Sequence, residues 1–438
     1  MQTLNSTEFS IVIDPGQSSK VLLPGDDPGG KALASRGRRD IFAWLRDVDQ
    51  IVMTRLPAFN RAATAERERV RTLIACVDPL LTASELLELG RRQYVDPRLA
   101  REVIGMTAWL AASVDTHLQR LGKEAGEGYR IFAGLEETLI ALGRLGQHPP
   151  VHSHLTYWVY NDFPLPRTFT GTAGEVHFNR AVNGVDRAKA FICQQIAPIA
   201  EGELDLNDPD AKVRIERADG AYGTIRQLFM EYRRPEAEGC PMRMPQKAFL
   251  TGMRPFLVNT KIGGKTYTGA NAANVHSWIE SDFRIGFAQP FYVDMVRGRY
   301  PTMMPEEPPI VEAFMARGSV CGVVARRLGL TVESLASSEI TELVGRCADL
   351  PQSARAAIKA FGRLAKSART TSAIHFGFIQ HYVEQAGKLL DPDEQCVALV
   401  CAGKGVSGMA IADGAALVDA MRKENPSITK LIDLAKVL

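Results

Sequence analysis

The sequence predicts an all-α fold in which a large helical domain follows a smaller helical domain. Apolar residues recur at three- and four-residue spacing over much of the chain, beginning with the stretch at 40–59, as they do on one face of an amphipathic helix. Strand signals are few and do not alternate with helices, which disfavours sheet-dominated and doubly wound folds. The length of 438 residues favours two domains over one small core.

Changes in composition divide the chain into three parts. Residues 1–38 are rich in Gly, Pro, Ser and Asp, which predicts an irregular N-terminal arm. Residues 39–175 are predicted to form the small helical domain and a connector at 146–175. That connector is rich in aromatic residues, so we expect it to pack against the rest of the protein, unlike a flexible linker. Residues 176–438 form the predicted large domain.

The expected helices follow from the apolar periods and from Asp-Pro pairs. Asp78-Pro79 and Asp96-Pro97 are typical of helix starts, because proline fits the first helical turn. In the small domain we expect helices near 40–59, 64–76, 82–92, 98–120 and 130–144. In the large domain we expect them near 180–200, 208–234, 245–260, 273–286, 288–298, 306–315, 318–328, 352–388 and 412–424.

Composition and charge exclude several classes of protein. A formal net charge of +2 argues against a nucleic-acid-binding protein that depends on a large positive field. No apolar run is long enough to span a membrane, and the N-terminus does not resemble a secretory signal. The seven cysteines are scattered singly, as expected for reduced thiols in a cytoplasmic protein. Nothing in the sequence indicates an oligomeric state.

The glycines at 403, 405 and 408 have the GxGxxG spacing of a dinucleotide-binding turn. Such a turn lets the backbone approach a pyrophosphate at a helix N-terminus. That site also requires a further strand with an acidic residue about twenty positions later, and the thirty remaining residues read as helix and tail. We therefore favour a flexible Gly-rich loop that closes over a pocket. A nucleotide-binding protein remains the less favoured alternative.

Two segments carry candidate ligand-binding side chains. His375 lies in a long predicted helix, and small residues precede it at 370–373, which would let a flat cofactor approach the helix closely. A single helical histidine is nevertheless more often structural than a ligand. In the segment 247–257, Phe249 and Arg254 could hold an aromatic ligand with a carboxylate, because guanidinium pairs bidentately with carboxylate. The alternative is a surface arginine beside a core phenylalanine.

The order and spacing of several motifs together resemble the indoleamine 2,3-dioxygenase family. This family belongs to a heme superfamily that also includes tryptophan 2,3-dioxygenase and monodechloroaminopyrrolnitrin synthase. The resemblance runs from about residue 140 to 425. It begins at the His-Pro-Pro connector and continues through KAFLTGMR, which is similar to the family's Lys-Ala-Phe-Phe-x-x-x-Arg. The segments GANAANVHSWIESDFRIG and RGRYPTMMPEE, the helix around His375 and the Gly-rich loop complete it.

The resemblance implies a role for each matching residue on the cofactor side. His375 matches the proximal ligand of heme b iron, and Asp282 a carboxylate near that histidine, which would fix its tautomer and raise its donor strength. Ala270 and Ser372 fall among the residues that bind the cofactor.

On the substrate side, Arg254 matches the arginine that binds the substrate carboxylate, and Phe249 the aromatic residue that packs on the indole. The remaining matches line the pocket: Phe191, Gln195, His154, Tyr157, Asn271 and the capping loop at Gly405–Gly408.

The sequence departs from the family pattern at four of these positions. Gln195 replaces a small hydroxyl residue, and His154 replaces an aromatic residue. Ser372 stands where an arginine is expected, and Met409 where the capping loop carries a threonine. These departures affect the identity of the substrate more than the binding of heme.

The function implied by the resemblance is a heme-dependent oxidoreductase that uses O2 to oxidise a small indole or amino-acid substrate. With L-tryptophan, insertion of both oxygen atoms would give N-formylkynurenine. One alternative is a biosynthetic enzyme that rearranges or oxidises a modified tryptophan, as monodechloroaminopyrrolnitrin synthase does. An alternative of another class is a heme-binding protein without turnover.

Overall fold

The structure of the protein is a computed structural model. The structure describes residues 40–62, 64–159, 161, 166–233, 244–267, 269–270, 275–303, 307–379, 381–382, 387–388, 390 and 425–438. In this part of the chain, helices predominate and the sheet structure is one two-stranded antiparallel hairpin. The prediction of an all-α fold is therefore confirmed. The N-terminal arm and the predicted helix at 412–424 lie outside the described residues.

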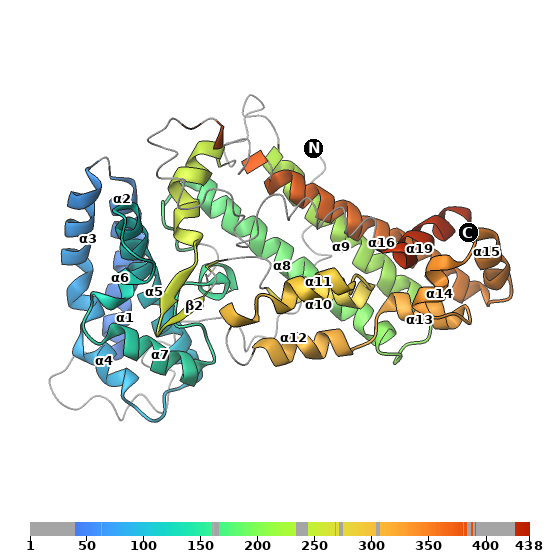
Figure 1. The fold of residues 1–438 in the computed structure, drawn as a ribbon, viewed down its shortest axis with the longest axis horizontal. Helices are drawn as coiled ribbons and strands as arrows, with labels where there is room; N and C mark the ends of the chain where they lie inside the picture. Colours follow the sequence, from blue (N-terminus) through green and yellow to red (C-terminus); the bar gives the residue numbers. More distant parts are fainter. Residues whose placement is uncertain are drawn as a thin grey trace.

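The N-terminal helices form one end of the molecule (Figure 1). These elements are α1 (Ile41–Gln50), η3 (Ile51–Arg55), α2 (Leu56–Arg61), α3 (Glu66–Leu81), α4 (Ser84–Gly90), α5 (Pro97–Arg120), α6 (Glu127–Arg130), α7 (Leu135–Gly146) and η4 (Leu155–Val159).

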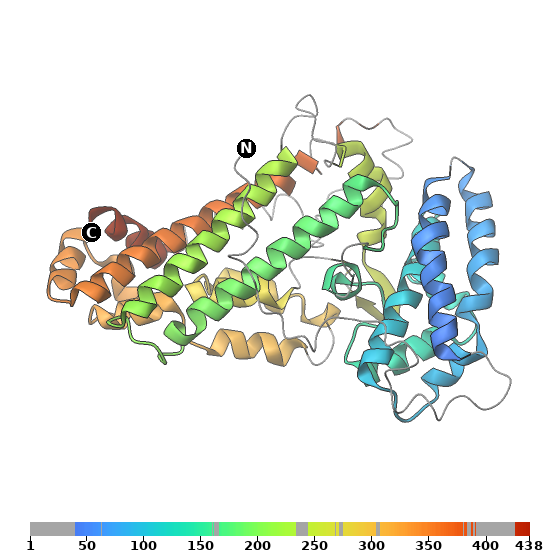
Figure 2. The ribbon, with the colours of Figure 1, turned by 180° about the vertical axis from the view of Figure 1, so that it is seen from behind.

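The rest of the protein is built on three long helices that lie side by side and are seen from behind in Figure 2. These are α8 (Ala173–Ala200), α9 (Pro209–Arg233) and α16 (Gln352–Ile379). The other elements are η6 (Ala248–Met253), η7 (Arg254–Leu257), β1 (Thr260–Ile262), β2 (Lys265–Tyr267), α10 (His276–Ile285), α11 (Pro290–Arg297), η9 (Tyr300–Thr302), α12 (Glu307–Ala316), α13 (Val320–Arg327), α14 (Val332–Ser337), α15 (Ile340–Ala348) and α19 (Pro426–Val437).

One of the two predicted Asp-Pro helix starts is correct and the other is wrong. Asp96 caps α5 by accepting hydrogen bonds from the amides of Arg98 and Leu99. Pro79, in contrast, lies inside the last turn of α3. The helix continues past it because the two following leucines are buried and the carbonyl of Leu80 accepts a hydrogen bond from the Trp44 indole at 2.9 Å.

The predicted helix at 245–260 is replaced by several short elements. A π-helix, η6, and a 3-10 turn, η7, are followed by the hairpin, in which Thr260 pairs with Tyr267. Gly269 packs tightly behind this hairpin, because a Cβ there would lie 2.3 Å from the carbonyl oxygen of Leu257. Apolar periodicity alone does not separate a continuous helix from such a compact series of turns.

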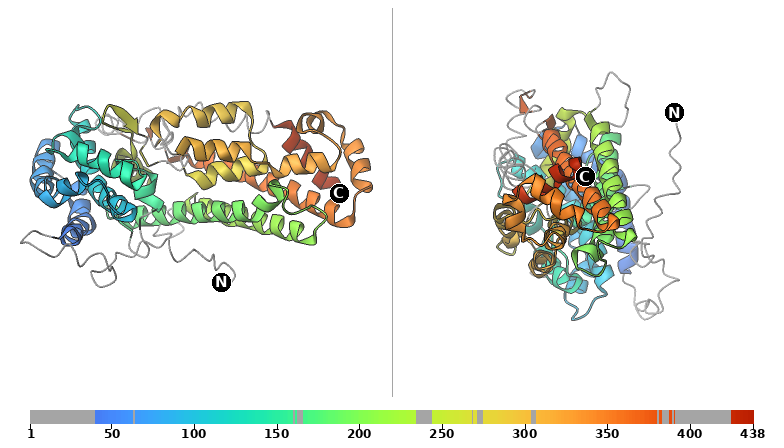
Figure 3. Two further views of the ribbon diagram at one scale, coloured as in Figure 1. Left: turned by 90° about the horizontal axis from the view of Figure 1, so that it is seen from below. Right: turned by 90° about the vertical axis from the view of Figure 1, so that its right-hand side faces the viewer.

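The buried apolar residues form two main cores, and α8 and α16 pass through both of them. On α8, Ala181 belongs to the first core and Val185 to the second. On α16, the residues up to Ala368 belong to the second core, whereas Phe378 belongs to the first. Several buried residues of the segment that carries η6 and η7, such as Phe249 and Phe256, also belong to the first core. Figure 3 shows this long arrangement from below and from its end.

The described residues of the connector at 146–175 pack against the first core, as its aromatic content predicted. Tyr157, Trp158 and Phe169 are each at most 3% exposed. Phe169 stacks on Phe256 of η7, with ring centroids 4.5 Å apart and planes at 9°. The connector therefore joins the N-terminal helices to the segment that carries Phe249 and Arg254.

Candidate functional site

His375 lies on α16 in the interval between the residues of the second core and those of the first. Its ring is stacked on Phe229 of α9, with centroids 5.2 Å apart, and meets Trp278 of α10 edge-on at 5.4 Å. Burial lowers the pKa of His375 to about 4, with a smaller contribution from the positive charge of Lys189. The imidazole is therefore neutral at pH 7, which is the form that ligates a metal.

The hydroxyl groups that precede His375 are engaged within its own helix. Thr371 donates to the carbonyl of Ser367 at 2.8 Å, and Ser372 donates to that of Ala368 at 3.2 Å. Such back-bonding satisfies the hydroxyls locally. This turn of α16 therefore combines short side chains with hydroxyls that are already paired.

Asp282 does not form a hydrogen bond with His375. Its Oδ1 accepts a hydrogen bond from Lys189 at 3.1 Å, and its Oδ2 accepts one from the hydroxyl of Tyr292 at 2.9 Å. The ammonium of Lys189 also donates to Tyr222 at 3.1 Å and to Ser281 at 3.0 Å. The carboxylate predicted to pair with the histidine thus belongs to a buried network centred on a lysine.

Lys189 was not among the predicted site residues, although the sequence carries a signal for it. Val185, Ile192 and Ile196 form a buried stripe along α8, and the same stripe includes position 189. A lysine on an apolar face is rarely buried unless it is paired. Its position on this stripe therefore indicated a buried partner of opposite charge.

A series of aromatic contacts connects His375 with Phe249. Beyond Phe229, the ring of Phe378 lies 6.2 Å away, and Tyr382 follows at 4.5 Å. Tyr382 meets the ring of Phe249 edge-on at 5.3 Å. Two residues that the sequence analysis assigned to one site are therefore joined by packed rings, at the junction of the two cores.

Phe249 and Tyr157 both lie in π-helical turns, and Arg254 immediately follows one of them. Phe249 is part of η6 and Tyr157 part of η4, while Arg254 begins η7 and is 3% exposed. Single π-helical turns in proteins occur frequently at functional sites. Two candidate segments thus share an uncommon backbone feature.

Tyr157 and His154 lie deep in the protein. The hydroxyl of Tyr157 donates to Glu175 at 2.8 Å, and its ring packs 5.4 Å from that of Trp109. His154 is 4% exposed, and burial lowers its pKa to about 4, opposed by the charge of Glu307. Neither residue has a ring contact with His375 among the described residues.

Phe191 and Gln195 occupy a different side of α8 from Lys189. At about 100° per residue, Phe191 lies roughly 160° around the helix from Lys189. Phe191 packs against the second core, and the buried Oε1 of Gln195 has no hydrogen-bond partner among the described residues. These two residues therefore lie on a different side of α8 from the one that carries Lys189.

The remaining predicted residues lie at or beyond the edge of the described structure. Ala270 is fully buried in the first core. Asn271 and the predicted capping loop at 405–408 lie outside the described residues.

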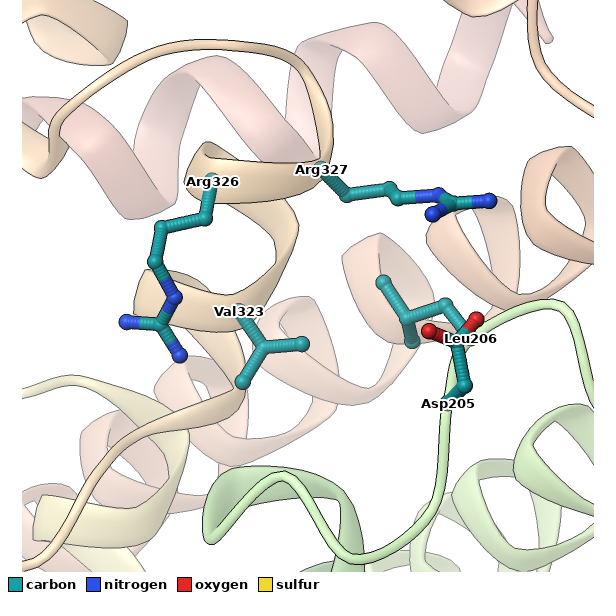
Figure 4. Close-up of a pocket in the computed structure, with 5 residues that line it drawn as sticks. All are labelled: Asp205, Leu206, Val323, Arg326 and Arg327. Carbon is teal, nitrogen blue, oxygen red and sulfur yellow. The ribbon is translucent and has the colours of Figure 1, made fainter.

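A separate surface hollow contains none of the predicted site residues. It lies between the end of α13 and the turn that joins α8 to α9 (Figure 4). Its lining consists of Asp205, Leu206, Val323, Arg326 and Arg327.

The described residues contain neither a cluster of metal-ligating side chains nor a membrane-spanning helix. Within the described ranges, no three His, Cys, Asp or Glu side chains are grouped so that they could hold a metal ion. No helix in that part of the chain is long and apolar enough to cross a membrane. No protein-family model matches the chain, and no curated protein shows significant similarity to it.

Proposed function

We propose that the protein binds heme b through His375 and uses O2 to oxidise an indole substrate, L-tryptophan or a related compound. The observation that carries the proposal is the neutral imidazole of His375, held between Phe229 and Trp278 at the junction of the two cores. Junctions between structural units are common positions for cofactor sites.

The donor set around His375 fits a heme. A heme needs a single imidazole from the protein, because the porphyrin supplies four of the iron ligands. Among the described residues none forms a hydrogen bond with the ring of His375, whose neighbours there are the aromatic rings of Phe229 and Trp278. Short side chains at Thr371 and Ser372 and the neighbouring aromatic rings suit a flat, largely apolar group.

When bound, heme would supply the O2 chemistry, while the protein provides binding and orientation. Phe229 of α9 and Trp278 of α10 contact the imidazole ring and would set its orientation. We assign recognition of a substrate carboxylate to Arg254 and packing on the indole to Phe249. The aromatic contacts that join Phe249 to His375 support their assignment to one site.

The first test is an absorption spectrum of the hemin-reconstituted protein, with and without dithionite and carbon monoxide. We expect a Soret band that shifts on reduction in the wild type and is lost in His375→Ala. His177→Ala is the matched control, because His177 is a partly buried histidine on α8 outside the proposed site. A His375→Ala variant with an unchanged heme spectrum would overturn the ligand assignment.

The second test measures O2 consumption and product mass with L-tryptophan and substituted indoles. Addition of two oxygen atoms supports dioxygenation, and another mass change supports a biosynthetic reaction on a modified substrate. Arg254→Gln should raise KM for substrates with a carboxylate and leave indole itself little affected. Full heme binding without O2 consumption on any indole would contradict the proposed activity and leave a heme-binding protein.

A further inference from the structure

Lys189 is an unusual residue for the interior of a helical protein. It is 6% exposed and lies among the apolar residues of α8. Its ammonium donates to three oxygen atoms, those of Tyr222, Ser281 and Asp282, at 3.0 to 3.1 Å. A buried lysine is costly, so such a complete set of partners is required to hold it.

The partners of Lys189 keep it positively charged. Burial by itself lowers the pKa of this amine, but the carboxylate of Asp282 and the hydroxyl of Tyr222 more than reverse that effect, so the pKa is raised above its ordinary value. The nitrogen lone pair is therefore protonated, and Lys189 is not available as a nucleophile. What it contributes at this position is a fixed positive charge.

Trp278 is a neighbour of both this charge and His375. The ammonium of Lys189 is 5.7 Å from the centroid of the Trp278 ring, and the centroid of the His375 ring is 5.4 Å from that of Trp278. Asp282, the negative member of the pair, is also bound by Tyr292 of α11. His375 is therefore close to the cationic member of a buried and immobilised ion pair.

We propose that Lys189 is a positioning residue whose charge raises the reduction potential of a heme bound by His375. The inference rests on the proposed function. Reduction adds one electron to the site, and a nearby fixed cation stabilises the added negative charge, more strongly in a low-dielectric interior than in water. The ferrous form, which binds O2, is thereby favoured.

The test is the midpoint potential of the reconstituted protein in a set of charge variants. Lys189→Met removes the cation and leaves Asp282 negative, so we expect a lower potential than in the wild type. Asp282→Asn leaves the cation uncompensated, so we expect a higher potential. The double variant with Lys189→Met and Asp282→Asn removes both charges, so its midpoint potential should return toward the wild-type value.

Two further variants separate charge from packing. Lys189→Arg retains the positive charge, so its midpoint potential should remain close to that of the wild type. Tyr222→Phe removes one hydrogen bond to Lys189 but no charge, so its potential should remain close to that of the wild type. If Lys189→Met does not fold, the proposal is tested by Asp282→Asn alone. A higher midpoint potential in that variant supports it, and an unchanged or lower one overturns it.

The outcomes distinguish this inference from the function on which it rests. Opposite shifts in the two single variants support the role of Lys189. Unchanged potentials, or shifts of the same sign, overturn that role while a Soret band that depends on His375 still supports heme binding. A wild-type protein that takes up no heme overturns both proposals.

Discussion

The imidazole of His375 is nearly parallel to the ring of Phe229, with centroids 5.2 Å apart and an angle of 18° between the planes. The two residues lie on α16 and α9, which pack against each other along the second core. The orientation of the imidazole is therefore set by packing between helices, since Asp282 does not bind it. Any change that loosens this pair should affect the proposed heme site directly.

We predict that Phe229→Ala weakens heme binding as well as stability. Phe229 is 9% exposed, and loss of a phenylalanine of this burial costs about 3 to 5 kcal/mol of unfolding free energy. The released imidazole should also allow heme to transfer faster to a heme-free acceptor protein. Phe314→Ala is the control, because Phe314 is 8% exposed but belongs to a separate core around α10 and α12. Equal heme transfer rates in both variants would contradict the role given to Phe229.

We predict that Glu175 is essential for the first core. The carboxylate is fully buried and accepts hydrogen bonds from the hydroxyl of Tyr157 at 2.8 Å, the amide of Phe169 at 2.7 Å, and both the amide and the hydroxyl of Thr170. Glu175→Ala removes the acceptor that these donors share, although the hydroxyl of Thr170 also lies 2.9 Å from that of Thr172. The substitution should cost roughly 3 to 5 kcal/mol in urea unfolding. Tyr157→Phe removes one of these donors and should cost about 1 to 2 kcal/mol. A smaller loss in Glu175→Ala than in Tyr157→Phe would disprove this ranking.

The helical class was predictable because apolar periodicity is a local property of the sequence. The residues at which helices begin and end were less predictable. Pro79 was expected to begin a helix, yet it lies near the end of one, because burial of Leu80 and Leu81 outweighs the hydrogen bond that proline cannot donate. Such a tertiary effect is not visible in local spacing.

The site was predictable only in part, for a similar reason. Single residues such as His375 and Phe249 could be selected from motifs, but their connection through Phe378 and Tyr382 depends on how α16 passes between two cores. The partner of Asp282 also required the fold, because Lys189 is 93 residues away in sequence. The only local sequence signal for Lys189 was its position, as a charged residue, on the apolar stripe of α8.

We predict that buried histidines of the connector make the protein sensitive to acid. His152 is 3% exposed, and burial lowers its pKa to about 3 from an ordinary value of 6.5. The unfolded chain therefore takes up a proton more readily than the folded one, and stability falls as the pH decreases from 6.5 toward about 3. The loss amounts to about 1.4 kcal/mol per pH unit.

The measurement is urea unfolding between pH 7 and pH 4.5. His152→Met removes the titrating group with a similar volume, so the variant should lose less stability than the wild type over this interval, by about 2 to 3 kcal/mol. At pH 7 it should be modestly less stable, because Thr156 loses its contact with the imidazole at 3.0 Å. Parallel pH profiles for the two proteins would show that the His152 ring is not buried as described.

We predict opposite effects of the same substitution at two helical glycines. On α16, a Cβ at Gly362 would lie 2.4 Å from the Cβ of Ala435 and 2.5 Å from the carbonyl oxygen of Leu431, both on α19. The backbone of α19 cannot move aside as a flexible side chain does, so Gly362→Ala must displace the helix. It should lower the free energy of unfolding by about 1 to 3 kcal/mol.

On α9, a Cβ at Gly220 meets no atom within 4 Å. Gly220→Ala should therefore stabilise the protein by about 0.5 to 1 kcal/mol, because alanine restricts the unfolded chain and favours the helix. Urea unfolding of the two variants tests the close approach of α16 and α19, since a stabilised Gly362→Ala would mean that the two helices do not pack at this distance.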